Sequence, residues 1–204
     1  MKNNEHWENV FSTKSENEVS WYQAYPQISI DFIQQFQLSS DAKIIDVGGG
    51  DSYLIDALLE LGYSNLTVLD ISAKAIEKLK NRLGTRANNK VTFIVSDILD
   101  FNPTIVYDVW HDRASFHFLT GKIQIKKYAA LVALAIADKG NLVIGTFSKT
   151  GPKKCSGLDI TQYSESKMIE IFKTHFDFID SKEVEHQTPF NTIQNFIFCN
   201  FKRK

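Results

Sequence analysis

The chain has 204 residues, of which 43% are hydrophobic and 12% aromatic, with 10 Gly and 4 Pro. This composition is typical of a folded domain with a sizeable core, and it excludes a disordered, fibrous or collagen-like chain. Lys and Arg number 23 against 24 Asp and Glu, and the pI is about 6.5. No overall positive field therefore favours nucleic acid or an anionic membrane as a partner.

The polar start of the chain and the shortness of its apolar runs predict a cytoplasmic protein without a signal peptide or a membrane span. Cys155 and Cys199 are too few for a disulfide framework, and neither stands in a Cys/His pattern of zinc-site spacing. We therefore expect two incidental thiols and no bound metal. No pattern in the sequence predicts an oligomeric state.

Two strand–turn–helix units come first among the predicted elements. Residues 43–47 form a short apolar run that ends in three glycines, and apolar residues then recur at helical spacing up to Gly62. Residues 66–70 are predicted as the next strand, and Ser72 can cap a helix that ends before Gly84. Strand and helix alternate in this part of the chain.

Three more β-rich segments continue the alternation, and a helix ending at residues 139–140 is predicted before the last of them. The segments are residues 91–95, 106–110 and 141–147. Strands that alternate with helices need right-handed crossovers and a mostly parallel sheet with helices on both faces. We therefore predict a doubly wound α/β fold.

The last third of the chain departs from this alternation. A helix is predicted over about residues 165–175, and two β-rich segments, 176–184 and 193–201, follow with a short connection between them. No crossover helix fits into that connection, so the two segments are predicted to form an antiparallel hairpin at one edge of the sheet.

Open parallel sheets bind ligands at the carboxyl ends of their strands, so the residues there are candidates for a site. The first strand delivers Asp46 and the glycine turn Gly48–Gly50, where a ligand can approach the amides of the next helix. The second strand ends in Asp70, and a carboxylate there can accept both hydroxyls of a ribose. A dinucleotide turn would need a third glycine where this chain has Tyr53, so NAD is disfavoured.

The order and spacing of three motifs resemble the class I, seven-β-strand S-adenosylmethionine-dependent methyltransferases. The motifs are Asp46-Val47-Gly48-Gly49-Gly50, Asp70, and Ser96-Asp97-Ile98. The resemblance covers roughly residues 40–148 and implies a seven-stranded sheet that ends in an antiparallel hairpin. It also implies one methyltransferase domain over residues 1–204, with an N-terminal helical cap segment (1–40) and a Rossmann-like core (41–204).

The resemblance implies S-adenosylmethionine as cofactor and assigns residues to it. Gly48, Gly49 and Gly50, with Asp46, would lie near its methionine part, and Asp70 with Ile71 near its ribose. Asp97 would reach the adenine amino group and Ile98 the adenine ring. Two alternatives come from the residues themselves: Asp97 can be a turn carboxylate, and Ile98 can be a core residue.

Trp21 and Tyr22 resemble the Trp-Tyr segment of some lysine-directed members of the superfamily, including those acting on translation elongation factors. Their aromatic faces can cover a sulfonium and attract it by cation–π interaction. The alternative is that both residues, with Ile28, Phe32 and Ile33, pack an amphipathic leading helix onto the sheet.

The fourth strand leads into Trp110-His111-Asp112-Arg113-Ala114-Ser115, where members of this superfamily usually meet the acceptor, so His111, Asp112 and Arg113 are the candidate catalytic residues. Lysine-directed relatives typically carry Asp-Lys/Arg-Gly-Thr there, and this chain departs from that pattern at Ala114 and Ser115. His111 and His117 are candidate bases, with a structural histidine as the alternative for each. The polar loop at residues 148–157, with its three lysines, either attracts an acidic acceptor or is simply solvated.

These expectations combine into a methyltransferase with an unidentified acceptor, a protein lysine or other amine being placed ahead of a small molecule. The motifs of nucleobase, glutamine and arginine methyltransferases are absent from the sequence. Two rival classes remain. A nucleotide-binding oxidoreductase would bind a nicotinamide cofactor, and a non-catalytic module would bind S-adenosylmethionine without turnover.

Overall fold

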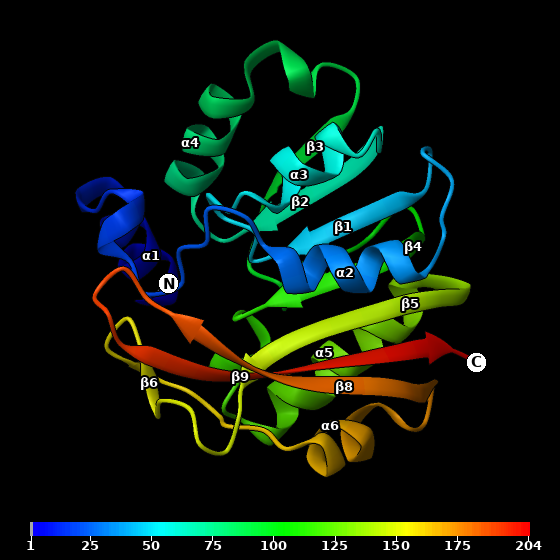
Figure 1. Ribbon diagram of the computed structural model, residues 1–204. Coiled ribbons are helices and arrows are strands. Elements are labelled where there is room, and N and C mark those ends of the chain that lie inside the picture. The colour runs from blue at the N-terminus through cyan, green and yellow to red at the C-terminus, as the bar shows by residue number, and fades with distance from the viewer. Residues whose placement is uncertain (1) are drawn as a thin grey trace.

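The computed structural model describes the backbone of residues 2–204 and the side chains of residues 4–204 (Figure 1). Its main sheet contains β1 (Lys43–Val47), β2 (Asn65–Asp70), β3 (Val91–Val95), β4 (Tyr107–Arg113), β5 (Ile136–Phe147), β8 (Phe176–Gln187) and β9 (Ile193–Arg203). The helices are α1 (Lys2–Thr13), α2 (Gln27–Gln35), α3 (Leu54–Glu60), α4 (Ala73–Leu83), α5 (Lys122–Ala135) and α6 (Glu165–Phe172). Short 3-10 turns lie at Glu16–Glu18, Gly84–Ala87 and Phe116–Phe118, and β6 (Lys154–Cys155) pairs with β7 (Leu158–Asp159).

The sheet has the strand order β3-β2-β1-β4-β5-β9-β8. β1 to β5 pair in parallel, whereas β9 is antiparallel to both β5 and β8. The predicted doubly wound sheet with a C-terminal antiparallel hairpin is thereby confirmed. In Figure 1 the arrowheads of β1 and β4 point toward α1, and that of β9 points away.

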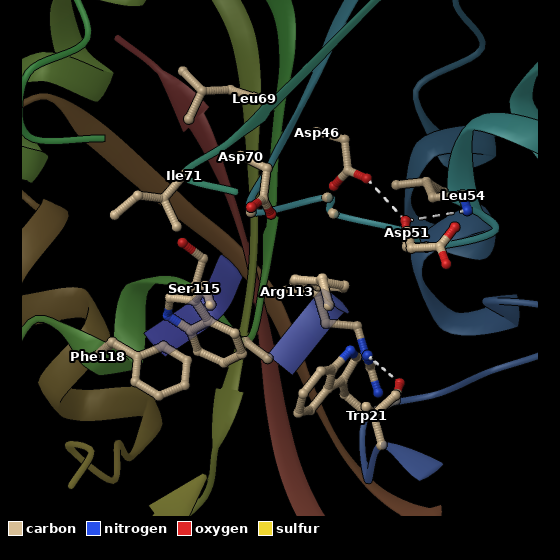
Figure 2. A pocket seen from close by; sticks show the side chains of 18 of the residues that line it. Trp21, Asp46, Asp51, Leu54, Leu69, Asp70, Ile71, Arg113, Ser115 and Phe118 are labelled. Atoms are coloured by element: carbon tan, nitrogen blue, oxygen red, sulfur yellow. Dashed lines mark hydrogen bonds between the residues drawn. The ribbon is translucent and has the colours of Figure 1, made fainter. Parts of the chain in front are cut away.

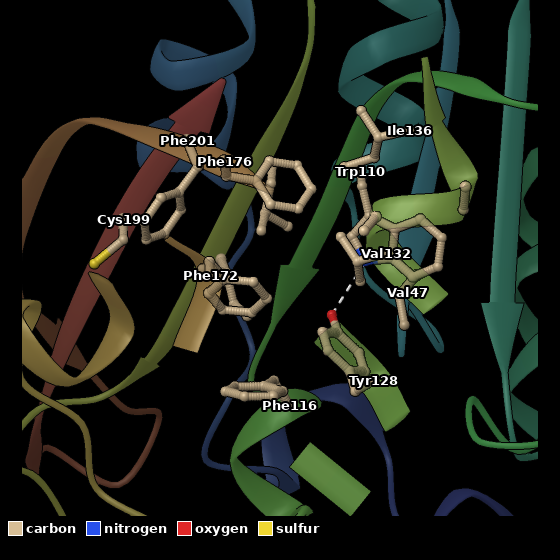
Figure 3. Close-up of a cluster of buried hydrophobic side chains, with 14 of the residues drawn as sticks. Val47, Trp110, Phe116, Tyr128, Val132, Ile136, Phe172, Phe176, Cys199 and Phe201 are labelled. Carbon is tan, nitrogen blue, oxygen red and sulfur yellow. Dashed lines mark hydrogen bonds between the residues drawn. The ribbon is translucent and has the colours of Figure 1, made fainter. Parts of the chain in front are cut away.

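Helices cover both faces of the sheet, and each face has its own buried cluster. On one face, α2, α3 and α4 enclose Ile33, Leu58 and Leu79 together with strand residues such as Val68. On the other face, α5 and α6 enclose a cluster rich in aromatic side chains around Trp110 (Figure 3). This two-sided burial is what fixes a parallel sheet in the interior of the domain.

Capping residues set the ends of α4 as the sequence predicts. The hydroxyl oxygen of Ser72 accepts a hydrogen bond from the amide of Ala75 (3.1 Å), which satisfies one of the free donors at the helix start. At the other end, Gly84 has φ +54°, a conformation in which glycine has no Cβ to clash. Ser72 thus begins α4 just after Asp70, the last residue of β2, and Gly84 ends the helix.

The boundaries around α5 differ from the prediction. α5 ends at Ala135, and residues 136–140 already belong to β5, so Lys139-Gly140 does not stop a helix. Lys139 has φ +60°, next to a register irregularity between β4 and β5, and the pair therefore marks a bulge in the strand. The helix predicted over about residues 165–175 also ends earlier, at Phe172.

The predicted N-terminal helical segment contains two helices, and α1 packs against α4. The Glu8 carboxylate accepts hydrogen bonds from the amides of Ala73 and Lys74, at the positive end of α4. Lys78 donates to the carbonyl of Lys14 (2.8 Å). α1 is thus held over the carboxyl end of the sheet. None of the helices in residues 2–204 is long and apolar enough to cross a membrane.

Candidate active site

A pocket lies at the carboxyl ends of β1, β2 and β4, beneath α1 (Figure 2). We call it the first pocket. It brings together every predicted site residue except Asp112 and the candidate base His117. Those residues are Trp21, Tyr22, Asp46, Gly48, Gly49, Gly50, Asp70, Ile71, Asp97, Ile98, His111 and Arg113. Side chains from segments far apart in the sequence therefore line one cavity, as the strand-end rule predicts.

The glycine turn leaves room that any other residue would fill. Gly48 has φ +65°, and a Cβ built on it would lie 2.5 Å from Cβ of Ser115. A Cβ on Gly50, at φ +50°, would lie 3.1 Å from the ring of Phe11 and 3.2 Å from a carboxylate oxygen of Asp70. The amide of Gly48 is held by the carbonyl of Leu69 at 2.7 Å. The turn is a rigid backbone cradle facing the pocket.

Asp70 is a buried carboxylate beside this cradle. Its Oδ1 accepts a hydrogen bond from the amide of Ser72 at 2.8 Å. Burial raises its pKa to about 7, an effect that the amide of Ser72 opposes and the nearby charge of Asp46 reinforces. A ligand that donates hydroxyl hydrogen bonds to Asp70 would stabilise its ionised form.

Asp97 and Ile98 follow β3 and line the same pocket. Oδ1 of Asp97 accepts a hydrogen bond from the amide of Leu99 (2.9 Å), which is a turn contact of the kind that the alternative interpretation expects. Ile98 is 9% exposed and belongs to the core cluster of the α5 face. Both residues thus have a structural role and still border the cavity.

His111 is held by two hydrogen bonds. Its Nδ1 lies 2.7 Å from Oδ1 of Asp46, and its Nε2 lies 2.8 Å from the hydroxyl of Ser29 on α2. The ring is 2% exposed. Because both ring nitrogens have partners within the protein, the geometry matches a structural histidine more closely than a free base.

Asp112 points to the opposite face of the sheet, since side chains alternate along β4. Its carboxylate accepts hydrogen bonds from the amides of Ser115 and Phe116 and from the hydroxyl of Tyr128 (2.6 Å). Burial raises the pKa of Asp112 to about 6, and the Tyr128 hydrogen bond opposes this rise. The expectation that Asp112 is catalytic therefore differs from the structure, where it fixes the turn after β4.

His117 also lies apart from the first pocket. Its Nδ1 accepts a hydrogen bond from the amide of Phe147, and the imidazole is fully buried. Burial and the charge of Arg113 lower its pKa to about 3, so the ring is neutral at physiological pH. The structure thus gives His117 the structural role that was the alternative to a base.

Arg113 is the last residue of β4 and reaches toward the cap segment (Figure 2). Its Nη1 donates to the carbonyl of Trp21 at 3.0 Å, and its guanidinium lies 4.8 Å from the ring centre of Phe196. Burial lowers its pKa to about 10, so it stays charged. Arg113 connects the sheet to the segment that precedes α2.

Aromatic side chains form part of the wall of the first pocket. Trp7 packs edge-on against both Trp21 and Phe118, with ring centres 5.6 and 5.2 Å apart. Trp21 and Tyr22 lie in the turns before α2 and not within a helix. Sequence reasoning missed Trp7 and Phe11, although their spacing of four residues places both on one side of a helix.

A second pocket adjoins the first and is lined by β8 and β9 residues. Tyr22, Gln23 and Arg113 line both pockets and therefore separate them. The loop after β5 contains the small β6–β7 hairpin, which carries Cys155 into the wall of the first pocket. Of its three lysines, Lys149 donates to a backbone carbonyl and Lys154 pairs with Asp159 (3.4 Å), both at exposed positions.

Comparison with known proteins finds similarity in both sequence and fold. The sequence profile of a family described as "Methyltransferase domain" matches residues 45–142. The chain is 26% identical over 113 residues to the mouse (Mus musculus) eEF1A lysine and N-terminal methyltransferase, covering 54% of this chain and 16% of that protein. It is 33% identical over 106 residues to malonyl-[acyl-carrier protein] O-methyltransferase of Anoxybacillus flavithermus, covering 51% and 38%. The chain thus spans well under two thirds of the length of these relatives.

A solved structure shares the whole fold. It is titled "Conversion of a Disulfide Bond into a Thioacetal Group during Echinomycin Biosynthesis" and superposes with a TM-score of 0.80 at 18% identity, covering 98% of this chain and 93% of that one. The described residues also fit S-adenosylmethionine, since the cradle at Gly48 and Gly50 is space that a Cβ would fill, with a buried carboxylate beside it. Residues 45–142 thus match a methyltransferase domain, and the chain as a whole shares its fold with that solved structure.

Proposed function

We propose that this chain binds S-adenosylmethionine in the first pocket and transfers its methyl group to an acceptor. The observation that carries the proposal is the position of Asp70. Its carboxylate is buried and has an oxygen 3.2 Å from the point that a Cβ on Gly50 would occupy. A carboxylate at the end of the second strand can accept both ribose hydroxyls, and such charge-assisted hydrogen bonds are strong. We propose further that residues 1–204 act as one domain, in which the cap segment closes the pocket of the core.

We infer roles for the remaining residues from their places around the cavity. Gly48–Gly50 would hold the methionine part against the backbone, Asp46 would support that turn, and Ile71, Asp97 and Ile98 would border the adenosine. Trp21 and Tyr22 would exclude water and face the sulfonium. When bound, the cofactor supplies an activated methyl group, so the protein contributes binding and orientation and needs no nucleophile of its own.

The acceptor has to provide its own lone pair. His111 has both ring nitrogens engaged, and His117 is buried outside the pocket, so neither is placed to take a proton from an acceptor. A neutral amine or an already ionised oxygen or sulfur nucleophile needs no such base. The named relatives act on both a protein and a carrier-bound malonyl group, which supports either a protein amine or a small molecule.

The transfer of a labelled methyl group tests the proposal. The chain is incubated with methyl-labelled S-adenosylmethionine and with the protein and small-molecule fractions of a cell extract, and label is counted in each fraction. We expect label in one fraction, formed together with S-adenosylhomocysteine, and none with the Asp70→Ala variant. A chain that binds the cofactor but labels neither fraction would be a non-catalytic binding module, which would overturn the proposal.

A further inference from the structure

The guanidinium of Arg113 has donors that the protein leaves without acceptors. Its Nη1 is bound to the Trp21 carbonyl, whereas its Nε and Nη2 are buried and have no partner among the residues that the structure describes. A buried donor without a partner is destabilising, and more so when it is charged. Buried donors without partners are uncommon in folded proteins, so this pair calls for a role in the function of the site.

Arg82 shows that the fold can satisfy a half-buried arginine fully. Its guanidinium donates to the carboxylates of Asp51 and Asp56 and to the backbone carbonyls of Asp51 and Ser52. No carboxylate takes the corresponding place beside Arg113 among residues 4–204. The nearest candidate, Asp46, is already engaged by His111 (2.7 Å) and by Ser52 (3.2 Å).

The two unpartnered nitrogens of Arg113 lie on one edge of the planar guanidinium. Nε and Nη2 present two parallel N–H bonds, and a carboxylate accepts such a pair with both of its oxygens. A single carbonyl oxygen meets both donors only with bent hydrogen bonds and without a full negative charge. The free edge therefore selects a bidentate anion.

Arg113 itself lines both pockets, with its Nε/Nη2 edge buried in the partition between them. With Tyr22 and Gln23 it forms the partition between the first pocket and the second. The second pocket is walled by aromatic side chains, among them Tyr25, Phe196 and Phe198. Glu185, His186 and Gln187 also line this pocket, so a molecule lying there would have aromatic faces and polar side chains around its body and a cation at the end nearest the first pocket.

Resting on the proposed function, we propose that the methyl acceptor is a small carboxylic acid. One of its carboxylate oxygens forms the bond to the methyl carbon as the bond from that carbon to the sulfonium sulfur breaks, which gives a methyl ester and S-adenosylhomocysteine. The carboxylate of the acid pairs with the Nε/Nη2 edge of Arg113, and its apolar body lies in the second pocket. The carboxylate of the cofactor's own methionine part has the same chemistry, so a test has to separate the two sources. Phenylacetate and phenylacetamide serve as matched probes, because they share an aromatic body and differ in the carboxylate.

The first titration measures the cofactor side. S-adenosylhomocysteine and 5′-methylthioadenosine, which lacks the amino-acid part, are titrated by calorimetry into the unaltered chain and into Arg113→Gln and Arg113→Lys. We expect both affinities to change by less than about threefold in either variant. A loss confined to S-adenosylhomocysteine would assign Arg113 to the cofactor's carboxylate and overturn the inference. If the unaltered chain bound neither compound, the proposed function itself would fall.

The second titration measures the acceptor side with protein saturated in S-adenosylhomocysteine. The unaltered chain should bind phenylacetate about tenfold or more tightly than phenylacetamide, the difference expected for a charge-assisted bidentate pair. Arg113→Gln should abolish this preference and Arg113→Lys should reduce it, because a lysine keeps the charge without the fork. Lys149→Gln removes an exposed cation outside both pockets and should leave the preference intact. Equal binding of the two probes, or a preference that survives Arg113→Gln, would overturn the inference while leaving the proposed function standing.

Discussion

Replacing Asp70 by Asn should stabilise the cofactor-free chain while weakening cofactor binding. Asp70 is 6% exposed, and burial raises its pKa from 3.8 to about 7. At neutral pH and above, the folded state therefore carries a carboxylate that would be better solvated in the unfolded chain. Asn keeps the acceptor for the amide of Ser72 and removes the charge.

The sign of the pH dependence follows from the raised pKa. Between the unfolded pKa of 3.8 and the folded pKa of about 7, the folded state binds more protons than the unfolded state, so stability falls as pH rises through this window. The variant has no carboxylate at this position and is free of that loss. The unfolding free energy of Asp70→Asn minus that of the unaltered chain should therefore increase by about 2–3 kcal/mol between about pH 5 and about pH 8.

Urea unfolding at these two pH values measures the difference. Asp138→Asn serves as the control, because Asp138 is exposed near the amino end of β5, away from the first pocket. The control should track the unaltered chain at both pH values. In parallel, Asp70→Asn should weaken S-adenosylhomocysteine about tenfold or more, since its amide cannot offer two charged acceptors to a ribose. A difference in unfolding free energy that stays constant with pH would refute the burial argument.

Three further results are expected. Gly48→Ala should lower the melting temperature and abolish cofactor binding, because the new Cβ would lie 2.5 Å from Cβ of Ser115. Gly62→Ala, where a Cβ would meet nothing within 4 Å, should cost only backbone strain, and equal losses in both variants would contradict a cradle built by the glycine turn. Tyr128→Phe should cost about 1–3 kcal/mol of unfolding free energy in urea, because the buried carboxylate of Asp112 loses its 2.6 Å partner; an unchanged midpoint would show that this bond contributes nothing. A chelator should leave methyl transfer unchanged, and inhibition that added Mg²⁺ or Zn²⁺ reverses would contradict a metal-free site.

Local sequence signals predicted the elements whose apolar residues follow a single helical or strand spacing. The helix from Ser72 to Gly84 was predictable because its caps and its apolar spacing agree. The start of β5 was not, because Lys139-Gly140 has the composition of a helix stop and forms a bulge instead. Its conformation depends on the pairing with β4, a non-local contact that a single sequence does not display.

Strand position predicted which residues line the first pocket, whereas the hydrogen bonds that each of them makes were not predictable. The strand-end rule brings His111 and Arg113 to the first pocket, but Asp112 between them points to the other face, because predicting β4 to end at residue 110 hid the alternation that continues to Arg113. Ser29, which holds His111, comes from α2, and no spacing in the chain connects the two. Tertiary hydrogen bonds of this kind decide whether a histidine has a ring nitrogen available to act as a base.

The most direct test of the central claim is a calorimetric titration of the unaltered chain and of Asp70→Ala with S-adenosylmethionine, and with NADH for comparison. We predict micromolar binding of S-adenosylmethionine to the unaltered chain, a loss of about tenfold or more in the variant, and no binding of NADH. Binding of NADH in preference to S-adenosylmethionine, or an affinity for S-adenosylmethionine that Asp70→Ala leaves unchanged, would contradict the account.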